Sequence, residues 1–243
     1  IIFVDSDDYI EKYALETFND AISNSYSPDV LITRLRQVYN DNHVQYMDAD
    51  MPVRKLQLSK KDDIIDWVFN KSENTWPAVK YIIQRDFINS HKLQFAVGYY
   101  HEDIDWTSKV FSYASSFSCS DYYWYSHRMG RKGSITTDAN VKRTLDIIEL
   151  VNKNINSITS DRTLNIDQRN IIFKRLIRSL FVSLSNYRHY SASEKDMVLE
   201  AILNCKEILF TYADSFQHKL FLLFCRIFGF KSGLEVMSII HRV

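Results

Sequence analysis

The chain has 243 residues, of which 46% are hydrophobic and 25% charged, as is ordinary for a globular protein with a substantial core. Thirty acidic residues balance thirty basic ones. The basic residues are scattered, so the sequence offers no field to attract nucleic acid, and no nucleic-acid partner is expected. The three cysteines lack metal-ligand spacing, and the sequence contains neither a long apolar run nor a secretory leader. We therefore expect a cytoplasmic protein.

The first ten residues join a short apolar run, Ile1–Val4, to a cluster of three carboxylates. The run predicts a buried strand, and carboxylates at the carboxyl end of a strand lie where open α/β sheets bind ligands. Asp5, Asp7 and Asp8 are hard oxygen donors that suit Mg²⁺ or Mn²⁺ together with a phosphate. The alternative is a solvated turn in which Asp7 or Asp8 caps the next helix.

Three kinds of metal-linked protein place acidic residues in this way, and the neighbouring residues separate them. Tyr9 and Ile10 do not fit an EF-hand calcium loop. Tyr9 also departs from the phosphatases of the haloacid dehalogenase type, in which the first carboxylate, here Asp5, is the nucleophile. The third kind is the nucleotide-sugar glycosyltransferases, whose Asp-x-Asp motif holds a metal on the diphosphate of the donor.

The next segments alternate between helical and strand patterns. Leu15, Phe18 and Ile22 recur at helical spacing and predict a short helix. The run Pro28–Leu35 predicts a strand, and residues Val38–Met47, with an Asn-Asp-Asn turn, predict a hairpin or loop.

Further along, Ser59 and Asp62 form a capping box that predicts a helix to about residue 70. Residues Trp76–Ile83 fit either a helix or a strand, and a short helix is expected near residues 86–89.

A second carboxylate cluster consists of Glu102, Asp103 and Asp105 and opens a predicted helix. Acidic residues in a first helical turn are favoured by the helix dipole, so plain capping is one interpretation and a catalytic carboxylate is the other. After it, Tyr122–Tyr125 predicts a strand, and the basic segment Ser126–Ser134 follows. That segment contains two of the five glycines, which favours an anion-binding loop over a solvated one.

From Asp138 the sequence predicts helices almost throughout. Two more capping boxes are expected, at Ser193 with Asp196 and at Ser232 with Glu235. The most apolar segment, Lys219–Phe228, predicts a core helix, with a membrane-surface or oligomer contact as the alternative.

The two carboxylate clusters and their surroundings resemble glycosyltransferase family 2, a family of inverting enzymes with the GT-A fold. The resemblance covers about residues 1–137 and rests on the order and spacing of several motifs. These are Phe3–Ile10, Pro28–Ile32, Trp76–Phe87, His101–Asp103, Tyr125 with Arg128, and Gly133–Thr136.

The resemblance implies an α/β fold, the C-terminal part of a GT-A mixed sheet flanked by helices, over residues 1–137, followed by an all-helical region over residues 138–243. It implies that Asp5, Asp7 and Asp8 bind Mn²⁺ or Mg²⁺. It implies donor contacts from Asp5, Lys80 and Arg128. Asp103, with Glu102 beside it, would be the base that deprotonates the acceptor hydroxyl.

The implied function is inverting transfer of a sugar from a nucleotide-diphosphate donor to a saccharide or lipid-linked acceptor, in bacterial cell-surface polysaccharide synthesis at the inner face of the plasma membrane. Two departures stand out: the first half of the family's catalytic domain has no counterpart upstream of Ile1, and His127 alters the usual Tyr-x-Arg spacing before Arg128. A phosphatase using Asp5 and a non-catalytic helical interaction fragment are the alternatives.

Overall fold

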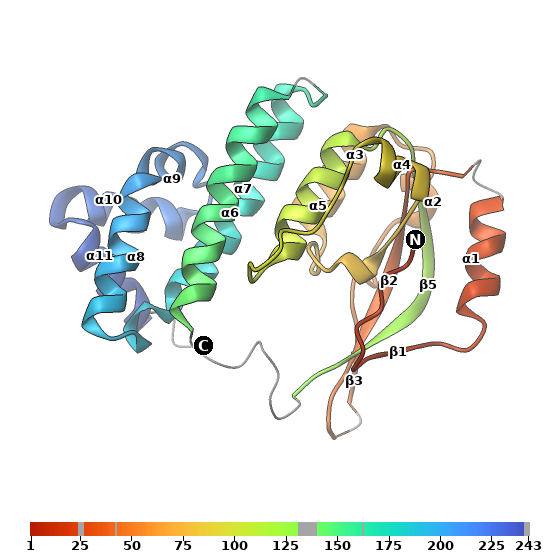
Figure 1. The fold of residues 1–243 in the computed structure, drawn as a ribbon, viewed down its shortest axis with the longest axis horizontal. Helices are drawn as coiled ribbons and strands as arrows, with labels where there is room; N and C mark the ends of the chain where they lie inside the picture. The colour runs from red at the N-terminus through yellow and green to blue at the C-terminus, as the bar shows by residue number, and fades with distance from the viewer. Residues whose placement is uncertain (24–26, 42, 131–139, 162, 241–243) are drawn as a thin grey trace. The chain divides into compact units, whose positions relative to one another are not determined.

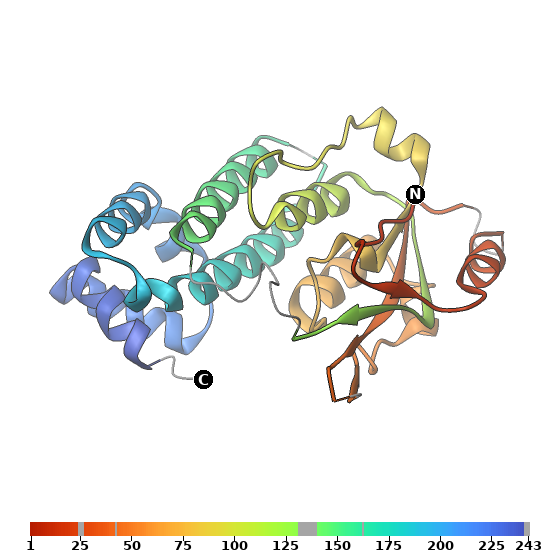
Figure 2. The ribbon, with the colours of Figure 1, turned by 60° about the horizontal axis from the view of Figure 1, so that its bottom comes forward.

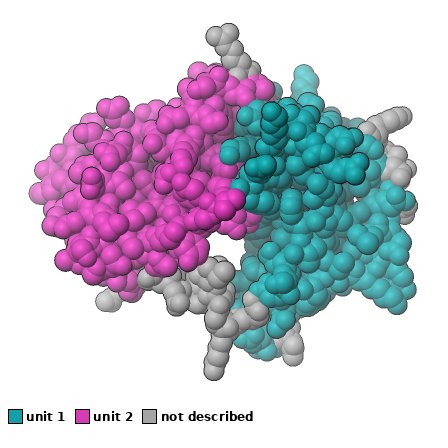
Figure 3. Space-filling model, in the orientation of Figure 1, with its two compact units in different colours: residues 1–95, 106–137 teal, residues 96–105, 138–243 magenta. Residues whose placement is uncertain are grey.

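The computed structural model describes residues 1–243 except 24–26, 42, 131–139, 162 and 241–243. It divides into two compact units, which Figure 3 colours separately. Unit 1 comprises Ile1–Phe95 and Trp106–Thr137, and unit 2 comprises Ala96–Asp105 and Asp138–Val243. Ala96–Asp105 thus groups with the residues after 137 and not with the rest of the first 137 residues.

Unit 1 is built on a mixed sheet whose central strand is β2 (Val30–Val38). On one side β2 pairs in parallel with β5 (Phe117–Arg128). On its other side β2 pairs antiparallel with β4 (Tyr81–Ile83) through its first residues and with β3 (Val44–Tyr46) through its last. The predicted hairpin is therefore the β2–β3 hairpin, which projects from the sheet (Figure 2).

The pairing of β2 with β5 is irregular. Between Ile32 and Leu35, β2 advances three residues while β5 advances six, from Cys119 to Tyr125. Such bulges bend a strand and increase its twist. The extended β5 is long enough to pair at its far end with β1 (Tyr9–Ile10), the short strand that follows the acidic cluster.

Helices cover both faces of the sheet (Figure 1). On one face lies α1 (Ala14–Ser23), whose Phe18 ring meets Trp124 edge-on at 5.1 Å. The other face packs against α3 (Lys61–Asp66), the π-helix η1 (Trp67–Lys71) and α5 (Glu102–Tyr113), where Phe111 contacts Phe69 and Tyr81. The remaining elements of this region are α2 (Val53–Leu56), the 3₁₀ turn η2 (Ala78–Lys80) and α4 (Arg85–Ser90).

Unit 2 is helical in its described residues after 139. Its elements are α6 (Val141–Ser160), α7 (Ile166–Leu184), η3 (Ser185–His189), α8 (Ala192–Asn204), α9 (Lys206–Tyr212), α10 (Phe216–Phe228) and α11 (Phe230–Ile240). Aromatic contacts join these helices: Phe173 meets Tyr212 at 5.0 Å, and Phe181 stacks on His218 at 3.9 Å. The predicted architecture, a mixed sheet flanked by helices and followed by a helical region, is confirmed.

Several local predictions are wrong. Residues Ile1–Val4 do not form a strand, because only Ile1 exchanges backbone hydrogen bonds with β4, through Ile83. The Ser59 hydroxyl donates back to the Lys55 carbonyl, and α3 has no side-chain cap.

The boxes predicted in the helical region are also displaced. The box of α8 is Ser191 with Glu194, two residues before the predicted one, because Ser191 has the extended backbone that a cap requires. The last helix begins at Phe230, so Ser232 lies inside it.

Helix α10 corrects the prediction for the apolar segment in part. It buries Leu222 and Cys225. Phe221 and Phe224 are half-buried. Five further apolar side chains of this helix are largely exposed among the described residues: Phe216, Leu220, Leu223, Ile227 and Phe228. No helix in the described ranges has both the length and the apolarity needed to cross a membrane.

Candidate functional site

The first acidic cluster forms a tight turn, closed by a hydrogen bond from the Asp8 amide to the Asp5 carbonyl at 3.2 Å. Since β2 and β5 are parallel, their carboxyl ends, Val38 and Arg128, lie at the same edge of the sheet. The turn is bonded to Tyr125 and Arg128 and so lies beside that edge. This is where α/β sheets usually bind ligands.

Asp8 anchors the turn to β5. Its carboxylate accepts one hydrogen bond from the Tyr125 hydroxyl, at 2.5 Å, and another from the Arg128 backbone amide, at 2.8 Å. The Tyr125 oxygen in turn accepts from the Asp5 amide at 3.2 Å. Burial, together with the bond to Asp8, raises the pKa of Tyr125 well above its usual value, so this hydroxyl remains a donor to Asp8.

A second network fixes the chain just beyond the turn. The Glu11 carboxylate forms an ion pair with Arg36 of β2 and accepts from the Ser126 hydroxyl at 3.0 Å. Arg36 also donates to that hydroxyl, at 2.8 Å. The Glu11 amide donates to the Trp124 carbonyl at 2.7 Å. The sheet therefore holds the chain at two places, within the acidic turn through Asp8 and just after it through Glu11.

The carboxylates of the turn differ in what they can offer to a cation. Both Asp8 oxygens already accept hydrogen bonds, whereas Asp5 is exposed and Asp7 half-buried. Mg²⁺ is usually held by one or two carboxylates together with substrate phosphates, a requirement that Asp5 and Asp7 fit. Among the described residues, no group of three or more His, Cys, Asp or Glu is arranged to hold a metal ion.

Arg128 ends β5 beside the turn, and its guanidinium donates to the Asp7 carbonyl at 3.3 Å. Its side chain is exposed, as a donor contact would require. Residues Arg131, Lys132, Gly133 and Ser134 of the expected anion-binding loop lie outside the described residues.

Lys80 is placed differently from the prediction that it contacts the donor. Its side chain is fully buried, and its ammonium donates to Asp48, Ser72 and the Asn74 carbonyl at 2.5, 2.6 and 3.0 Å. The ammonium also lies 5.0 Å from the centre of the Trp67 ring. A buried ammonium with these partners holds the loop between η1 and η2 and does not fit a nucleotide contact.

The second acidic cluster opens α5, as predicted, and belongs to unit 2. Glu102 is exposed and Asp103 half-buried. Asp105 is 3% exposed and accepts a hydrogen bond from the Asn154 amide of α6 at 3.1 Å. One acid of this cluster is thus structural, and two reach the surface.

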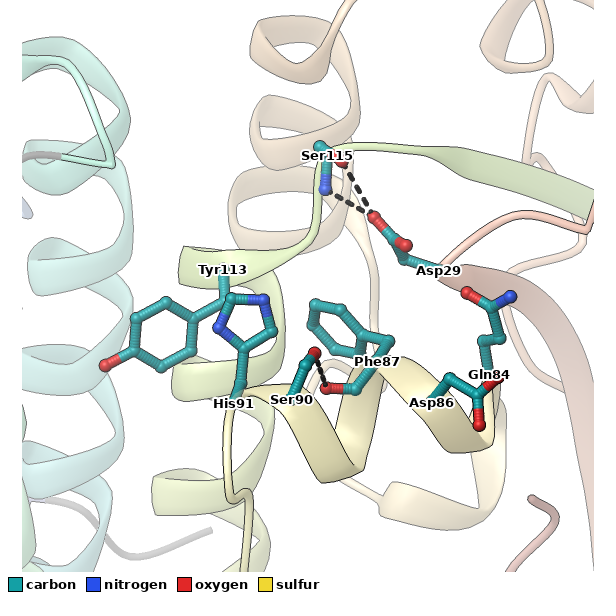
Figure 4. Close-up of a pocket in the computed structure, with 8 residues that line it drawn as sticks. All are labelled: Asp29, Gln84, Asp86, Phe87, Ser90, His91, Tyr113 and Ser115. Atoms are coloured by element: carbon teal, nitrogen blue, oxygen red, sulfur yellow. Dashed lines mark hydrogen bonds between the residues drawn. The ribbon is translucent and has the colours of Figure 1, made fainter.

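A cavity of about 350 Å³ lies at the opposite, amino-terminal end of β2 and β5 (Figure 4). The rings of His91 and Tyr113 stack along one wall, 4.9 Å apart. On another wall, Asp29 accepts from the amides of Ser115 and Ser116. Although burial opposes it, these bonds lower the pKa of Asp29. None of the predicted site residues lines this cavity.

Sequence reasoning missed the residues that support the two clusters. Glu11 and Arg36 are 25 residues apart, and no motif or spacing in the sequence indicates that they form an ion pair. Tyr125 was noted only as part of a motif, although a tyrosine hydroxyl can donate a hydrogen bond to a carboxylate.

The fold and the turn define a class: a mixed α/β sheet with an acidic turn at its carboxyl edge, followed by a helical region. Among solved structures, this fold is found in TarS of S. aureus.

The structure of TarS residues 1–349 matches with a TM-score of 0.69 at 17% identity, and the match covers 99% of this chain and 66% of that chain. The same segment in complex with UDP gives 0.66 at 18% identity with the same coverage. A further TarS structure gives 0.69 at 16% identity and covers 99% of this chain and 40% of that one. The chain thus spans less than two thirds of these proteins, and at such identities the likeness shows the fold alone.

No family model matches the chain, and no curated protein sequence matches it.

Proposed function

We propose that this chain is the metal-binding and acceptor-side portion of a glycosyltransferase that uses a nucleotide-diphosphate sugar. The observation that carries the proposal is the fold shared with TarS, a glycosyltransferase, over 99% of this chain. TarS has been solved in complex with UDP. We favour a transferase over a phosphatase of the haloacid dehalogenase type because the structural likeness is to TarS, a glycosyltransferase.

The acidic turn supplies the donor side of the proposed chemistry. Asp5 and Asp7 would hold Mn²⁺ or Mg²⁺, whose charge stabilises the departing diphosphate. Asp8, bonded to Tyr125 and Arg128, keeps the other two carboxylates in place. The guanidinium of Arg128 lies next to the turn and is exposed, so we assign it to the phosphates of the donor.

The acceptor side is assigned to the start of α5. An acceptor hydroxyl must lose its proton as it attacks the sugar, and a carboxylate can accept that proton. We propose Asp103 as this base, with Glu102 beside it. A single direct displacement inverts the anomeric carbon and requires no covalent nucleophile, so no further residue is assigned.

The proposed acceptor is a saccharide or a lipid-linked acceptor, in cell-surface polysaccharide synthesis on the cytoplasmic side of the membrane. The exposed apolar side chains of α10 are where we place the peripheral membrane or oligomer contact expected from the sequence.

The donor side is tested by calorimetry of UDP binding to the intact protein with and without Mn²⁺. The Asp5→Ala/Asp7→Ala variant is expected to lose the Mn²⁺-dependent part of the affinity. Asp121→Ala, which removes an exposed carboxylate elsewhere on β5, is the matched control and should bind as the wild type does. Unchanged affinity in the double variant would refute the metal assignment.

The acceptor side is tested by UDP release from a panel of UDP-hexoses and UDP-N-acetylhexosamines. Asp103→Asn is expected to lower turnover by about 10²- to 10⁴-fold, the range typical of a general base, while UDP affinity stays unchanged. Near wild-type turnover would rule out Asp103 as the base.

A further inference from the structure

The segment that carries Glu102 and Asp103 is held by a helix from a distant part of the sequence. Residues Gly98–His101, here called the base loop, precede α5 and belong to unit 2 with α6. The contacts between the base loop and α6 lie entirely within that unit, and they involve both backbone and side chains of the loop.

The buried carboxylate of Asp146 is the centre of these contacts. It accepts from the backbone amide of Tyr100 at 2.7 Å and from the Lys142 ammonium at 2.5 Å. Lys142 also donates to the Gly98 carbonyl at 2.8 Å. A carboxylate that is 7% exposed and bonded to an amide is a strong, directional anchor for the loop backbone.

A second set of contacts, one turn further along α6, holds the Tyr99 side chain. The Tyr99 hydroxyl donates to Glu149 at 2.6 Å and accepts from Lys153 at 2.7 Å. Lys142, Asp146, Glu149 and Lys153 are spaced by four, three and four residues, so they form one stripe on α6. We call this stripe the α6 clamp.

The loop that the clamp holds has a strained backbone at the residue before Glu102. His101 has φ +63°, in the left-handed region, where crowding between Cβ and the backbone carbonyl makes the conformation costly for a residue with a side chain. Gly98, at the other end, has φ +82° without such a cost. A strained conformation persists only where its surroundings impose it, and the clamp supplies those surroundings.

The first turn of α5 is held as well, by the hydrogen bond from Asn154 of α6 to the buried Asp105. Glu102 and Asp103 therefore lie between two attachment points on the same helix, one through the base loop and one through Asp105. Glu102 is exposed and Asp103 half-buried, so both carboxylates reach the surface.

We infer that the α6 clamp is a positioning device for the proposed catalytic base, and that Asp146 is its principal positioning residue. The inference rests on the proposed function and deepens it: the helical region takes part in catalysis by fixing the geometry of Asp103. Displacing a catalytic group by about 1 Å can cost on the order of 10²-fold in rate.

The test compares Asp146→Ala with Ser157→Ala, an exposed position on the same helix outside the clamp. Hydrogen exchange of the peptide spanning residues 98–105 and kinetics of UDP release are measured on the intact protein. Asp146→Ala is expected to speed exchange about tenfold and to lower kcat by about 10- to 100-fold, with the KM for the donor within twofold of wild type. Asp146→Asn, which keeps one acceptor oxygen for Tyr100, should fall between.

Unchanged exchange in Asp146→Ala would overturn the clamp, and faster exchange with full kcat would overturn its positioning role. A wild-type protein that binds UDP with Mn²⁺ but releases none from any donor would instead contradict the proposed function. The exchange measurement keeps these failures distinguishable.

Discussion

The acidic turn Asp5–Asp8 and the start of α5 are built on the same plan in different surroundings. In the turn, Asp8 is bonded to Tyr125, while Asp5 is exposed and Asp7 half-buried. At the start of α5, Asp105 is bonded to Asn154 and leaves Glu102 and Asp103 nearer to solvent. In each cluster, one acid fixes the backbone and its neighbours reach the surface, so the number of carboxylates in a motif exceeds the number that can act on a ligand.

The anchoring acids differ in burial. The loss in free energy of unfolding when each is replaced should increase with its burial. Asp48, which pairs with Lys80 inside unit 1, extends the series to an acid that is 1% exposed. A loss of stability that does not follow this order of burial would contradict the comparison.

Asp48→Ala is expected to destabilise the protein most, by about 3–5 kcal/mol, because it leaves the Lys80 ammonium buried without its charged partner. Chemical denaturation measures the loss. Asp50→Ala, at an exposed neighbouring acid, should change stability little. The double variant Asp48→Ala/Lys80→Met should recover much of the loss, and failure to do so would show that the charge is not its cause.

Asp105→Ala is expected to cost about 2 kcal/mol, because it leaves the buried Asn154 amide without this acceptor. Chemical denaturation of Asp105→Ala and Glu102→Ala compares a buried and an exposed acid in the same helical turn. Glu102 is exposed and should cost less than about 0.5 kcal/mol. Equal losses would contradict the division into an anchoring and a surface acid.

Tyr125→Phe is expected to cost about 1 kcal/mol, since it removes one hydrogen bond to the half-buried Asp8. It should also weaken Mn²⁺-dependent UDP binding if Asp8 holds the turn for Asp5 and Asp7. The same denaturation and calorimetry apply to the control variant Asp121→Ala, which should alter neither. If Tyr125→Phe lowered stability but left Mn²⁺-dependent UDP binding intact, the bond to Asp8 would not be needed for the proposed metal site.

The smallest effect concerns pH and the base loop. Burial, with a contribution from Arg143, lowers the pKa of His101, although Asp146 opposes the shift. As the pH falls, His101 therefore becomes protonated in the unfolded chain, where its pKa is near 6.5, at a higher pH than in the folded chain. Stability should fall as pH drops below about 6.5.

This pH dependence is measured as the change in Tm between pH 7.5 and pH 5.5. His101→Asn removes the titrating ring and tolerates the left-handed backbone, so its Tm should fall less over that interval. An identical fall in both proteins would exclude His101 as the source.

The sequence predicted the elements with strong periodicity and missed those that depend on distant partners. The strand over Val30–Val38 and the helix at Glu102 follow from local patterns. The strand expected at Ile1–Val4 failed because a strand exists only where a neighbour pairs with it, and there only Ile1 is paired. The cap of α8 was displaced by two residues because serines stand at both positions 191 and 193, and only the extended backbone of Ser191 selects between them.

For the candidate site, the sequence indicated the acidic clusters but not the role of each acid. Asp8 and Asp7 are adjacent and chemically identical, and the positions of Tyr125 and Arg128, 117 and 120 residues from Asp8, make one an anchor. Lys80 was assigned to the donor through the family resemblance, whereas its burial with Asp48 depends on a fold that brings residues 48, 72 and 80 together.

The irregular pairing of β5 sets a requirement on chain length. Six residues of β5 run beside three of β2, which adds about 10 Å of chain at about 3.3 Å per residue. That surplus brings the end of β5 to the acidic turn. Because side chains alternate along a strand, deleting one residue between Ser120 and Tyr123 would turn Tyr125 to the opposite face and withdraw its hydroxyl from Asp5 and Asp8 together. The number of residues in this part of β5 therefore determines whether the Tyr125 hydroxyl reaches the acidic turn.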